Sequence, residues 1–324
     1  MKSIFISVLY CTILALYNSI LYSQEIIYKI TGITGTAFIE RISFPKTTRA
    51  FRGSQIHSDH KLKTENNTQI EVLISQNGNK IGNIIVYENS IIAVNTPINK
   101  KDNNKISLSL LEGYVKLDID KKLDIETEIH TANTSTLVRG TEFEVAFSEN
   151  GNSMIVLNEG SVDIVTDNEK NKLNNKEVYI QNINSNGIIM PQSVENSSKV
   201  FLNKNEEISR ENTKYTIETL IEKMENLVYD DNAINDSKIN NEDDIQSLEL
   251  QSYRMFAANE GYYNSIVKLI NYDEDKKVEY LSYARKSLTL YSANQRAINK
   301  YNMALMRVKD KFDRIRKKFD ERIK

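Results

Sequence analysis

Glycines placed at the breaks between alternating apolar runs constrain the fold of this chain more than any other feature. Within residues 131–165, Phe143 and Val145 alternate with more polar residues, the period-two pattern of a strand with one buried face. Gly140 stands before this run, and Gly160 separates two further apolar runs. Because glycine adopts a positive φ at low cost, both positions are predicted corners. The stretch therefore predicts short strands joined by tight corners, with little helix.

The same pattern extends over residues 24–183, which we interpret as a mainly β domain. Residues 69–74 form a strand pattern that ends at Asn77-Gly78, a strong hairpin signal. The segment 108–117 is echoed by 155–164, including the Glu-Gly corner of each. Such echoes are expected if similar rungs stack, each burying its apolar face on the next, as in a twisted β-solenoid. A β-sandwich whose hairpins share turn chemistry is the open alternative.

These residues also resemble a known domain. The resemblance rests on a core motif and on two upstream pieces, Thr64 before the 69–74 strand and the run 110–115. The core motif consists of Val138, Arg139, Gly140, Thr141, Phe143 and Val145, followed by Glu159, Gly160 and Val162. Over roughly residues 32–183 the chain is similar to the FecR domain. The resemblance implies an all-β, solenoid-like periplasmic module that contacts other envelope proteins and is not an enzyme.

FecR itself is implied to relay a signal from an outer-membrane transporter to a cytoplasmic sigma factor. Here the domain follows an apolar leader directly, so we carry over its fold and its binding class, without the cytoplasmic anti-sigma segment. The motif residues are expected to be structural or to contact a partner. Arg139 either contacts a partner, caps a carbonyl, or pairs with a nearby carboxylate such as Glu142 or Glu159 at the corner. Thr141 is expected to tie the corner through its hydroxyl.

Residues 1–23 are interpreted as a secretory signal peptide. Lys2 precedes an apolar run over residues 4–21, and Ser23 offers a small residue at the cleavage position. An uncleaved leader that anchors the chain in the membrane is one alternative, because the run is just long enough to span a bilayer. A lipoprotein acylated at Cys11 is another. Cleavage of the signal peptide would leave an exported periplasmic protein. Because Cys11 is the only cysteine, the mature chain would have no disulfide.

A helical domain is predicted over residues 206–324, after an Asn- and Ser-rich linker at 184–205. Apolar residues recur there at spacings of three and four, with helices expected at about 244–272 and 276–322. Residues 206–249 carry 13 acids and 4 bases, whereas residues 276–324 carry 5 acids and 15 bases. These opposite charges favour an antiparallel helical hairpin, a three-helix bundle or a coiled coil. The long last helix could also pair with a second copy of the chain, so self-association through Lys276–Lys324 is a further expectation.

The sequence offers little that predicts chemistry. His57 and His60 could form half of a metal site, but we interpret their segment as a polar turn, and we predict no metal, no cofactor and no catalytic residue. The net charge of −2 gives no support for nucleic-acid binding. The basic tail 309–324 has three interpretations: a solvated flank, a surface for an acidic partner helix, or a surface for anionic lipid.

We therefore predict an exported, non-enzymatic protein-binding or scaffolding module of the cell envelope, with a role in signalling left open. Its partners would be other envelope proteins. The alternative is a structural homo-oligomer built through the long C-terminal helix. A hidden hydrolase or metal-dependent enzyme is the third hypothesis, which a stoichiometric metal at His57 and His60 would favour.

Overall fold

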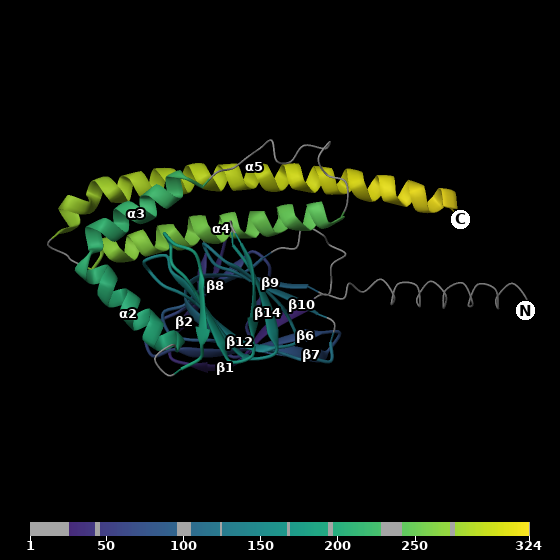
Figure 1. The fold of residues 1–324 in the computed structure, drawn as a ribbon, viewed down its shortest axis with the longest axis horizontal. Coiled ribbons are helices and arrows are strands. Elements are labelled where there is room, and N and C mark those ends of the chain that lie inside the picture. The colour runs from purple at the N-terminus through teal and green to yellow at the C-terminus, as the bar shows by residue number, and fades with distance from the viewer. Residues whose placement is uncertain are drawn as a thin grey trace, which may run out of the picture.

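The computed structural model describes residues 26–42, 46–95, 105–123, 125–166, 169–193, 197–227, 242–272 and 276–323. A β-rich part comes first and four helices, α2 to α5, follow within these residues (Figure 1). The strands are β1 (Ile26–Thr34), β2 (Ala37–Arg41), β3 (Thr47–Arg49), β4 (Gln55–Ile56), β5 (His60–Thr64), β6 (Gln69–Gln76), β7 (Asn79–Val86), β8 (Ile91–Val94), β9 (Lys105–Ile119), β10 (Glu126–His130), β11 (Ser135–Arg139), β12 (Glu142–Phe147), β13 (Ser153–Glu159), β14 (Ser161–Val165), β15 (Lys170–Asn174), β16 (Glu177–Gln181) and β17 (Ile188–Pro191). The predicted signal peptide at 1–23 lies outside the described residues.

The 17 strands form one continuous sheet that folds into two layers. Layer A has the order β17-β16-β13-β12-β9-β7-β6-β1-β4. Layer B has the order β15-β14-β11-β10-β9-β8-β5-β2-β3. Strand β9 belongs to both layers, since its first half pairs with β8 and β10 and its second half with β7 and β12. All pairs are antiparallel except β9 with β10.

The chain crosses between the layers at corners that share one backbone property, a positive φ. Seven of these corners are Gly35, Asn67, Asn89, Gly113, Gly140, Gly160 and Lys176. Hydroxyl groups tie neighbouring corners together: Thr68 Oγ1 accepts from Thr36 N at 2.9 Å, and Ser90 Oγ accepts from Tyr114 N at 3.0 Å. The predicted strand-corner-strand pattern is therefore confirmed at Gly140 and Gly160.

Apolar side chains from both layers meet in one core. Residues alternate along each strand, so that every second side chain points inward, as the period-two pattern predicts. Members of this core from layer A include Ile30, Val72, Ile84, Leu117, Phe143 and Ile155, and members from layer B include Leu62, Leu108, Ile129, Val138, Val162 and Leu173.

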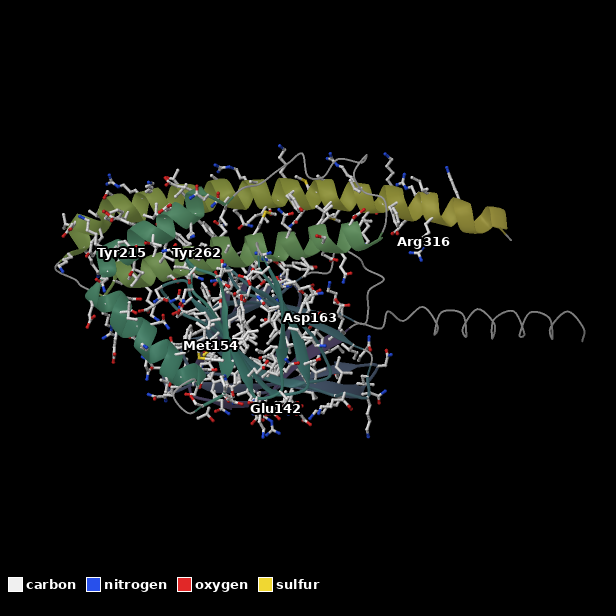
Figure 2. The ribbon with its side chains drawn as sticks, viewed as in Figure 1. Glu142, Met154, Asp163, Tyr215, Tyr262 and Arg316 are labelled. Carbon is white, nitrogen blue, oxygen red and sulfur yellow. The ribbon has the colours of Figure 1, made fainter. Side chains whose placement is uncertain are left out.

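The helices cover the outer faces of the layers. Helix α4 (Glu242–Ile270) packs on β9 and β10 of layer B, and α2 (Ser198–Glu211) packs on β12 and β13 of layer A. Met154 lies on this outer side of layer A, where it packs with Phe201 of α2 (Figure 2). Because both faces of each layer are partly covered, several strands are apolar on both sides.

Helix α5 (Lys277–Ile323) packs antiparallel to α4, and α3 (Thr213–Glu225) contacts both. The antiparallel direction follows from three polar contacts: Asn259 with Tyr291, Ser252 with Asn302, and Tyr301 with Leu248. At about 1.5 Å per residue α5 is roughly 70 Å long, and it extends beyond α4 (Figure 1). The predicted antiparallel helical packing is confirmed. None of the described helices is both long and apolar enough to cross a membrane.

The predicted linker at 184–205 is wrong in part. It contains strand β17, which pairs with β16, and the first half of helix α2, which begins at Ser198 and not at residue 206. The many Asn and Ser residues of this segment suggested a loop. They are tolerated because Phe201 supplies a buried contact to layer A, and because Ser198 Oγ donates a 2.6 Å hydrogen bond to Glu144.

Candidate functional site

The motif shared with the FecR domain builds one corner of the β part. Val138 and Val162 face each other across β11 and β14, and both are buried in the core together with Phe143. A Cβ atom on Gly140 would lie 2.5 Å from Cα of Lys121, and one on Gly160 would collide with the methyl group of Thr141. Both positions favour glycine, because each has a positive φ and a neighbouring atom fills the space, backbone at Gly140 and the Thr141 methyl group at Gly160.

The structure corrects the prediction for Thr141. Its oxygen is buried and has no hydrogen-bond partner among the described residues, so the hydroxyl does not tie the corner. Its methyl group instead packs against Gly160. The hydroxyl groups that do tie corners belong to residues outside the predicted motif. Thr64 is an example, since its Oγ1 donates to Tyr87 O at 2.5 Å and accepts from Ser90 N at 2.9 Å.

We expect Thr141→Val to raise the free energy of unfolding by about 1 kcal/mol, because the change removes a buried oxygen without a partner and keeps the shape. Thr64→Val is the matched control and should lower it by about 1–3 kcal/mol, because Ser90 N loses its acceptor. Urea denaturation of both variants measures the difference. A loss of stability in Thr141→Val would show that its hydroxyl has a partner.

The carboxylates considered as partners of Arg139 lie at the same corner, whereas the side chain of Arg139 lies outside the part of the chain that the structure describes. Arg139 ends β11, where its backbone pairs with Glu126. Glu142 and Glu159, the two carboxylates considered for Arg139, form ion pairs of 2.6 Å with Lys116 and Lys121. Val138, Phe143, Val145 and Val162 of the motif thus fill the core, whereas Glu159 and Gly160 are exposed.

The two histidines considered for a metal site lie side by side. His60 opens β5, so the predicted turn ends one residue earlier than expected, and its Nδ1 accepts from the backbone of His57 at 3.3 Å. The ring centroids are 5.3 Å apart. Within the described residues, no group of three or more His, Cys, Asp or Glu side chains gathers as metal ligands would.

A buried ionic cluster lies where α4 covers layer B, and sequence reasoning missed it. Lys105 Nζ of β9 lies 2.7 Å from Glu128 Oε1 of β10, and His130 Nε2 lies 3.4 Å from Glu128 Oε2. The other ring nitrogen of His130 is 2.9 Å from Ser135 Oγ. The ring of Tyr253 from α4 lies over His130, with centroids 5.2 Å apart. The sequence signal that could have revealed the cluster is the titratable residues Glu126, Glu128 and His130 at every second position of β10.

Burial sets the titration of this cluster. It lowers the pKa of His130 below its usual value near 6.5, and Lys105 and Arg254 act in the same direction against the opposing effect of Glu128. Burial also works against the charge of Glu128, but His130 and Lys105 hold the pKa of that carboxyl below its usual range. The folded protein therefore favours a neutral His130 next to a charged Lys105–Glu128 pair.

This cluster predicts a loss of stability in mild acid. In the unfolded chain His130 takes up a proton below about pH 6.5, whereas in the folded chain it stays neutral to lower pH. The free energy of unfolding should therefore fall below pH 6.5 by up to about 1.4 kcal/mol per pH unit. His130→Asn should flatten this slope in urea denaturation at several pH values. The control is His57→Asn, at an exposed position, and an equal effect of both variants would contradict the assignment.

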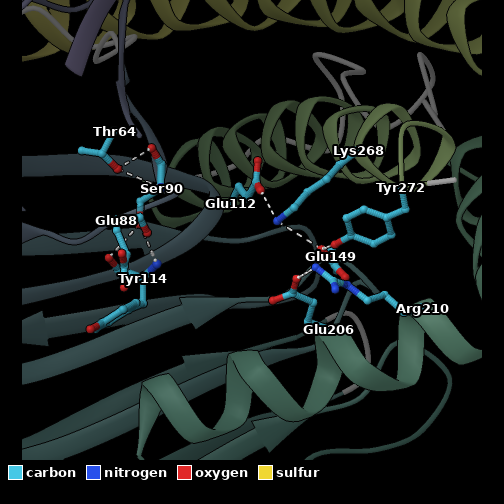
Figure 3. Close-up of polar contacts among 10 residues, drawn as sticks. All are labelled: Thr64, Glu88, Ser90, Glu112, Tyr114, Glu149, Glu206, Arg210, Lys268 and Tyr272. Atoms are coloured by element: carbon cyan, nitrogen blue, oxygen red, sulfur yellow. Dashed lines mark hydrogen bonds and ion pairs between the residues drawn. The ribbon is translucent and has the colours of Figure 1, made fainter. Parts of the chain in front are cut away.

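A second polar group joins three parts of the chain (Figure 3). Lys268 of α4 lies 2.8 Å from Glu112 of β9 and 3.1 Å from Glu149, which follows β12. Tyr272 donates to Glu149, and Arg210 of α2 lies over the Tyr272 ring at 4.9 Å. We call these residues the junction, because they link the β part to α2 and to the end of α4.

The carboxyl group of Glu149 in the junction has a raised pKa. Burial raises the pKa of Glu149, and one of its oxygens has no hydrogen-bond partner among the described residues. Burial acts to lower the pKa of Lys268, but Glu112 and Glu149 together raise it above its usual value. Lys268 therefore stays charged and holds two carboxylates on the β part. A further ion pair of 2.7 Å, Lys61 with Glu260, also ties layer B to α4.

One cavity near the helices is polar. It has a volume of about 400 Å³ and lies between the end of β16, the end of α3 and Tyr262 of α4. Its amide groups are partly engaged: Gln181 Nε2 donates to Ser185 O at 2.6 Å, and Asn133 Nδ2 donates to Gly151 O at 3.0 Å. We assign this cavity no chemistry.

Comparison with known proteins gives a family and two similar structures. Residues 60–163 match the family described as FecR protein. Two solved structures of a candidate anti-sigma factor from Parabacteroides distasonis each share 14% sequence identity with the chain, at a TM-score of 0.36. The similarity covers 42% of this chain and 61% of the other, so the chain spans less than two thirds of that protein's length. No curated protein matches the sequence.

Proposed function

Because residues 60–163 carry a FecR domain, we propose that this chain is an exported, non-enzymatic module that binds other proteins of the bacterial cell envelope. The matched segment runs from β5 to β14 and forms the centre of both layers. The proposal rests on the structural role of the domain's residues, which fill the core and build the corners. Apolar side chains fill the space between the layers, and most of the shared motif builds a corner. A partner protein would therefore bind to the outer faces or the ends of the layers.

We extend the proposal to the architecture of the two parts and to the location of the chain. We take the paired strands and their stacked corners as the rungs of a twisted, solenoid-like domain over residues 24–183. We take residues 206–324 as a helical domain whose first helix, α2, starts earlier, at Ser198. The leader at 1–23 would direct the chain to the periplasm, where the partners would be other envelope proteins.

A signalling role is supported by the way the two parts meet. Two carboxylates of the β part contact Lys268 of α4, and Lys61 contacts Glu260 of the same helix. Ionic contacts of this kind depend strongly on exact geometry. A partner that shifts β9 or the segment after β12 would therefore change how α4 sits, which would pass a binding event to the helices.

The length of α5 favours a second candidate function, a structural homo-oligomer. Helix α5 has 47 residues and α4 has 29, so the last turns of α5 extend past the start of α4. Two copies that pair through these turns would form a coiled coil.

Cross-linking of the full chain in envelope preparations of its source organism, read by mass spectrometry, distinguishes the two functions. Heterologous cross-links that fall on residues 26–192 and are lost when the partner is removed support the binding module. Links only between copies, on residues 277–323, support the homo-oligomer. A chain that stays monomeric and yields no heterologous link would contradict both.

A further inference from the structure

One end of the two layers is closed by a short segment that crosses from layer B to layer A. Strands β3 and β4 are the outermost strands of layers B and A at this end, and residues 50–54 connect them. Ala50 N donates to Ala37 O at 2.8 Å, and Gly53 N donates to Ile30 O at 2.8 Å. Ser54 returns a bond, since its carbonyl accepts from Ile30 N at 2.9 Å. These bonds hold the crossover against the end of the sheet.

This crossover holds an aromatic side chain in solvent. The side chain of Phe51 is 67% exposed, although its backbone N–H is bound by Ser54 Oγ at 3.2 Å. The next residue but one, Gly53, has a φ of +97°, which fixes a tight turn. Single exposed apolar side chains are common on protein surfaces, so Phe51 is informative only together with the residues around it.

The surroundings of Phe51 are basic. Residues 46–56, which comprise the crossover and its two flanking strands, contain three Lys or Arg and no acid, whereas the whole chain carries a net charge of −2. Lys29, Arg49 and Arg52 are exposed on the strands and the crossover next to Phe51. Charged residues on short edge strands also prevent sheets from adding to one another. That role concerns the bases alone, and the exposed phenylalanine among them adds an apolar group to the same surface.

We propose that this end of the β part docks on an anionic phospholipid surface. Phe51 would enter the boundary between head groups and acyl chains, and Lys29, Arg49 and Arg52 would face the phosphates. An exposed aromatic side chain flanked by cations matches that boundary, where aromatic rings are favoured and basic residues are attracted. An acidic protein surface would satisfy the charges alone, so an acidic peptide serves as the competing probe below.

The path of the chain agrees with this orientation. The apolar run at 4–21 ends four residues before β1, the strand that pairs with β4 at this end. Four residues reach about 14 Å at most. A leader inserted in a membrane would therefore bring this same end of the sheet to the bilayer. The proposal concerns a lipid surface and does not depend on which protein the FecR domain binds.

The chain contains no tryptophan, so a single introduced indole reports the contact. The chain is prepared from Gln24, which removes the apolar leader and keeps every described residue. Phe51→Trp is mixed with vesicles of phosphatidylcholine, with or without phosphatidylglycerol. We expect its emission to shift to the blue only with phosphatidylglycerol. The matched control is Tyr215→Trp on α3, a position that is also 67% exposed (Figure 2), which should not shift.

Sedimentation with the same vesicles tests the charges. Arg49→Glu with Arg52→Glu should lower the vesicle-bound fraction at least about tenfold, and Phe51→Ala by about fivefold. The control pair Lys172→Glu and Lys176→Glu, exposed near the opposite end of the layers, should leave it nearly unchanged. Equal binding to neutral vesicles, equal loss in the control pair, or binding to a polyglutamate peptide in place of vesicles would overturn the proposal.

Discussion

Gly113→Val should lower the free energy of unfolding by about 4 kcal/mol, the largest effect expected from a single corner. Gly113 has a φ of +81°, which a β-branched residue adopts only at a cost of about 1–2 kcal/mol. A Cβ atom there would also lie 2.7 Å from the carbonyl oxygen of Asn89 and would overlap Ser90 Oγ. Relief requires movement of the neighbouring corner, which costs about 1–3 kcal/mol more. Thermal and urea denaturation measure the loss.

Gly78→Val is the matched control for that experiment. Gly78 has nearly the same φ, +79°, but a Cβ atom there would meet nothing within 4 Å. Its cost should be the backbone strain alone, about 1–2 kcal/mol. The difference between the two variants measures how tightly neighbouring corners pack. Equal losses would show that the corners are not in contact and would contradict the stacked arrangement.

Lys105→Met should lower the free energy of unfolding by about 3–5 kcal/mol, because it leaves a carboxylate buried without its nearest cation. Glu128 is fully buried, and Lys105 Nζ at 2.7 Å is its closest charged partner. Since the cluster lies under α4, the variant should also loosen that helix. Urea denaturation measures the stability, and hydrogen exchange in residues 245–260 measures the helix.

Two further variants make the Lys105 result specific. The double variant Lys105→Met with Glu128→Gln should recover at least half of the loss, because no unpaired charge remains buried. Lys121→Met breaks the ion pair between Lys121 and Glu159, two side chains that are about half exposed. It should lower the free energy of unfolding by less than about 1 kcal/mol. A large loss in Lys121→Met, or no recovery in the double variant, would show that burial of charge is not the cause.

The strands and corners near the motif could be predicted from sequence because the signals are local. Phe143 and Val145 alternate with Glu142 and Glu144, and a glycine marks each break. Asn67 and Asn89 occupy equivalent corners without glycine, and Lys176 does so as well. Asparagine tolerates a positive φ but also fills ordinary loops, so these corners gave no clear signal.

What could not be predicted depends on contacts between distant segments. The parallel pairing of β9 with β10 has no local signature, and neither has the use of β9 in both layers. The cluster of Lys105, Glu128 and His130 was missed for a related reason. Charges on alternate positions of a strand suggest a solvent-facing side, and here α4 covers that side. The helices α4 and α5 were predicted within a few residues, since their apolar spacing is regular.

Strand β9 has a consequence for how the β part is made. Every strand that precedes it in sequence lies on one side of it in both layers, and every later strand lies on the other side. The earlier half can thus be completed on β9 as soon as residue 119 has left the ribosome. The later half then finds a finished template with two free edges, so assembly can follow the direction of synthesis.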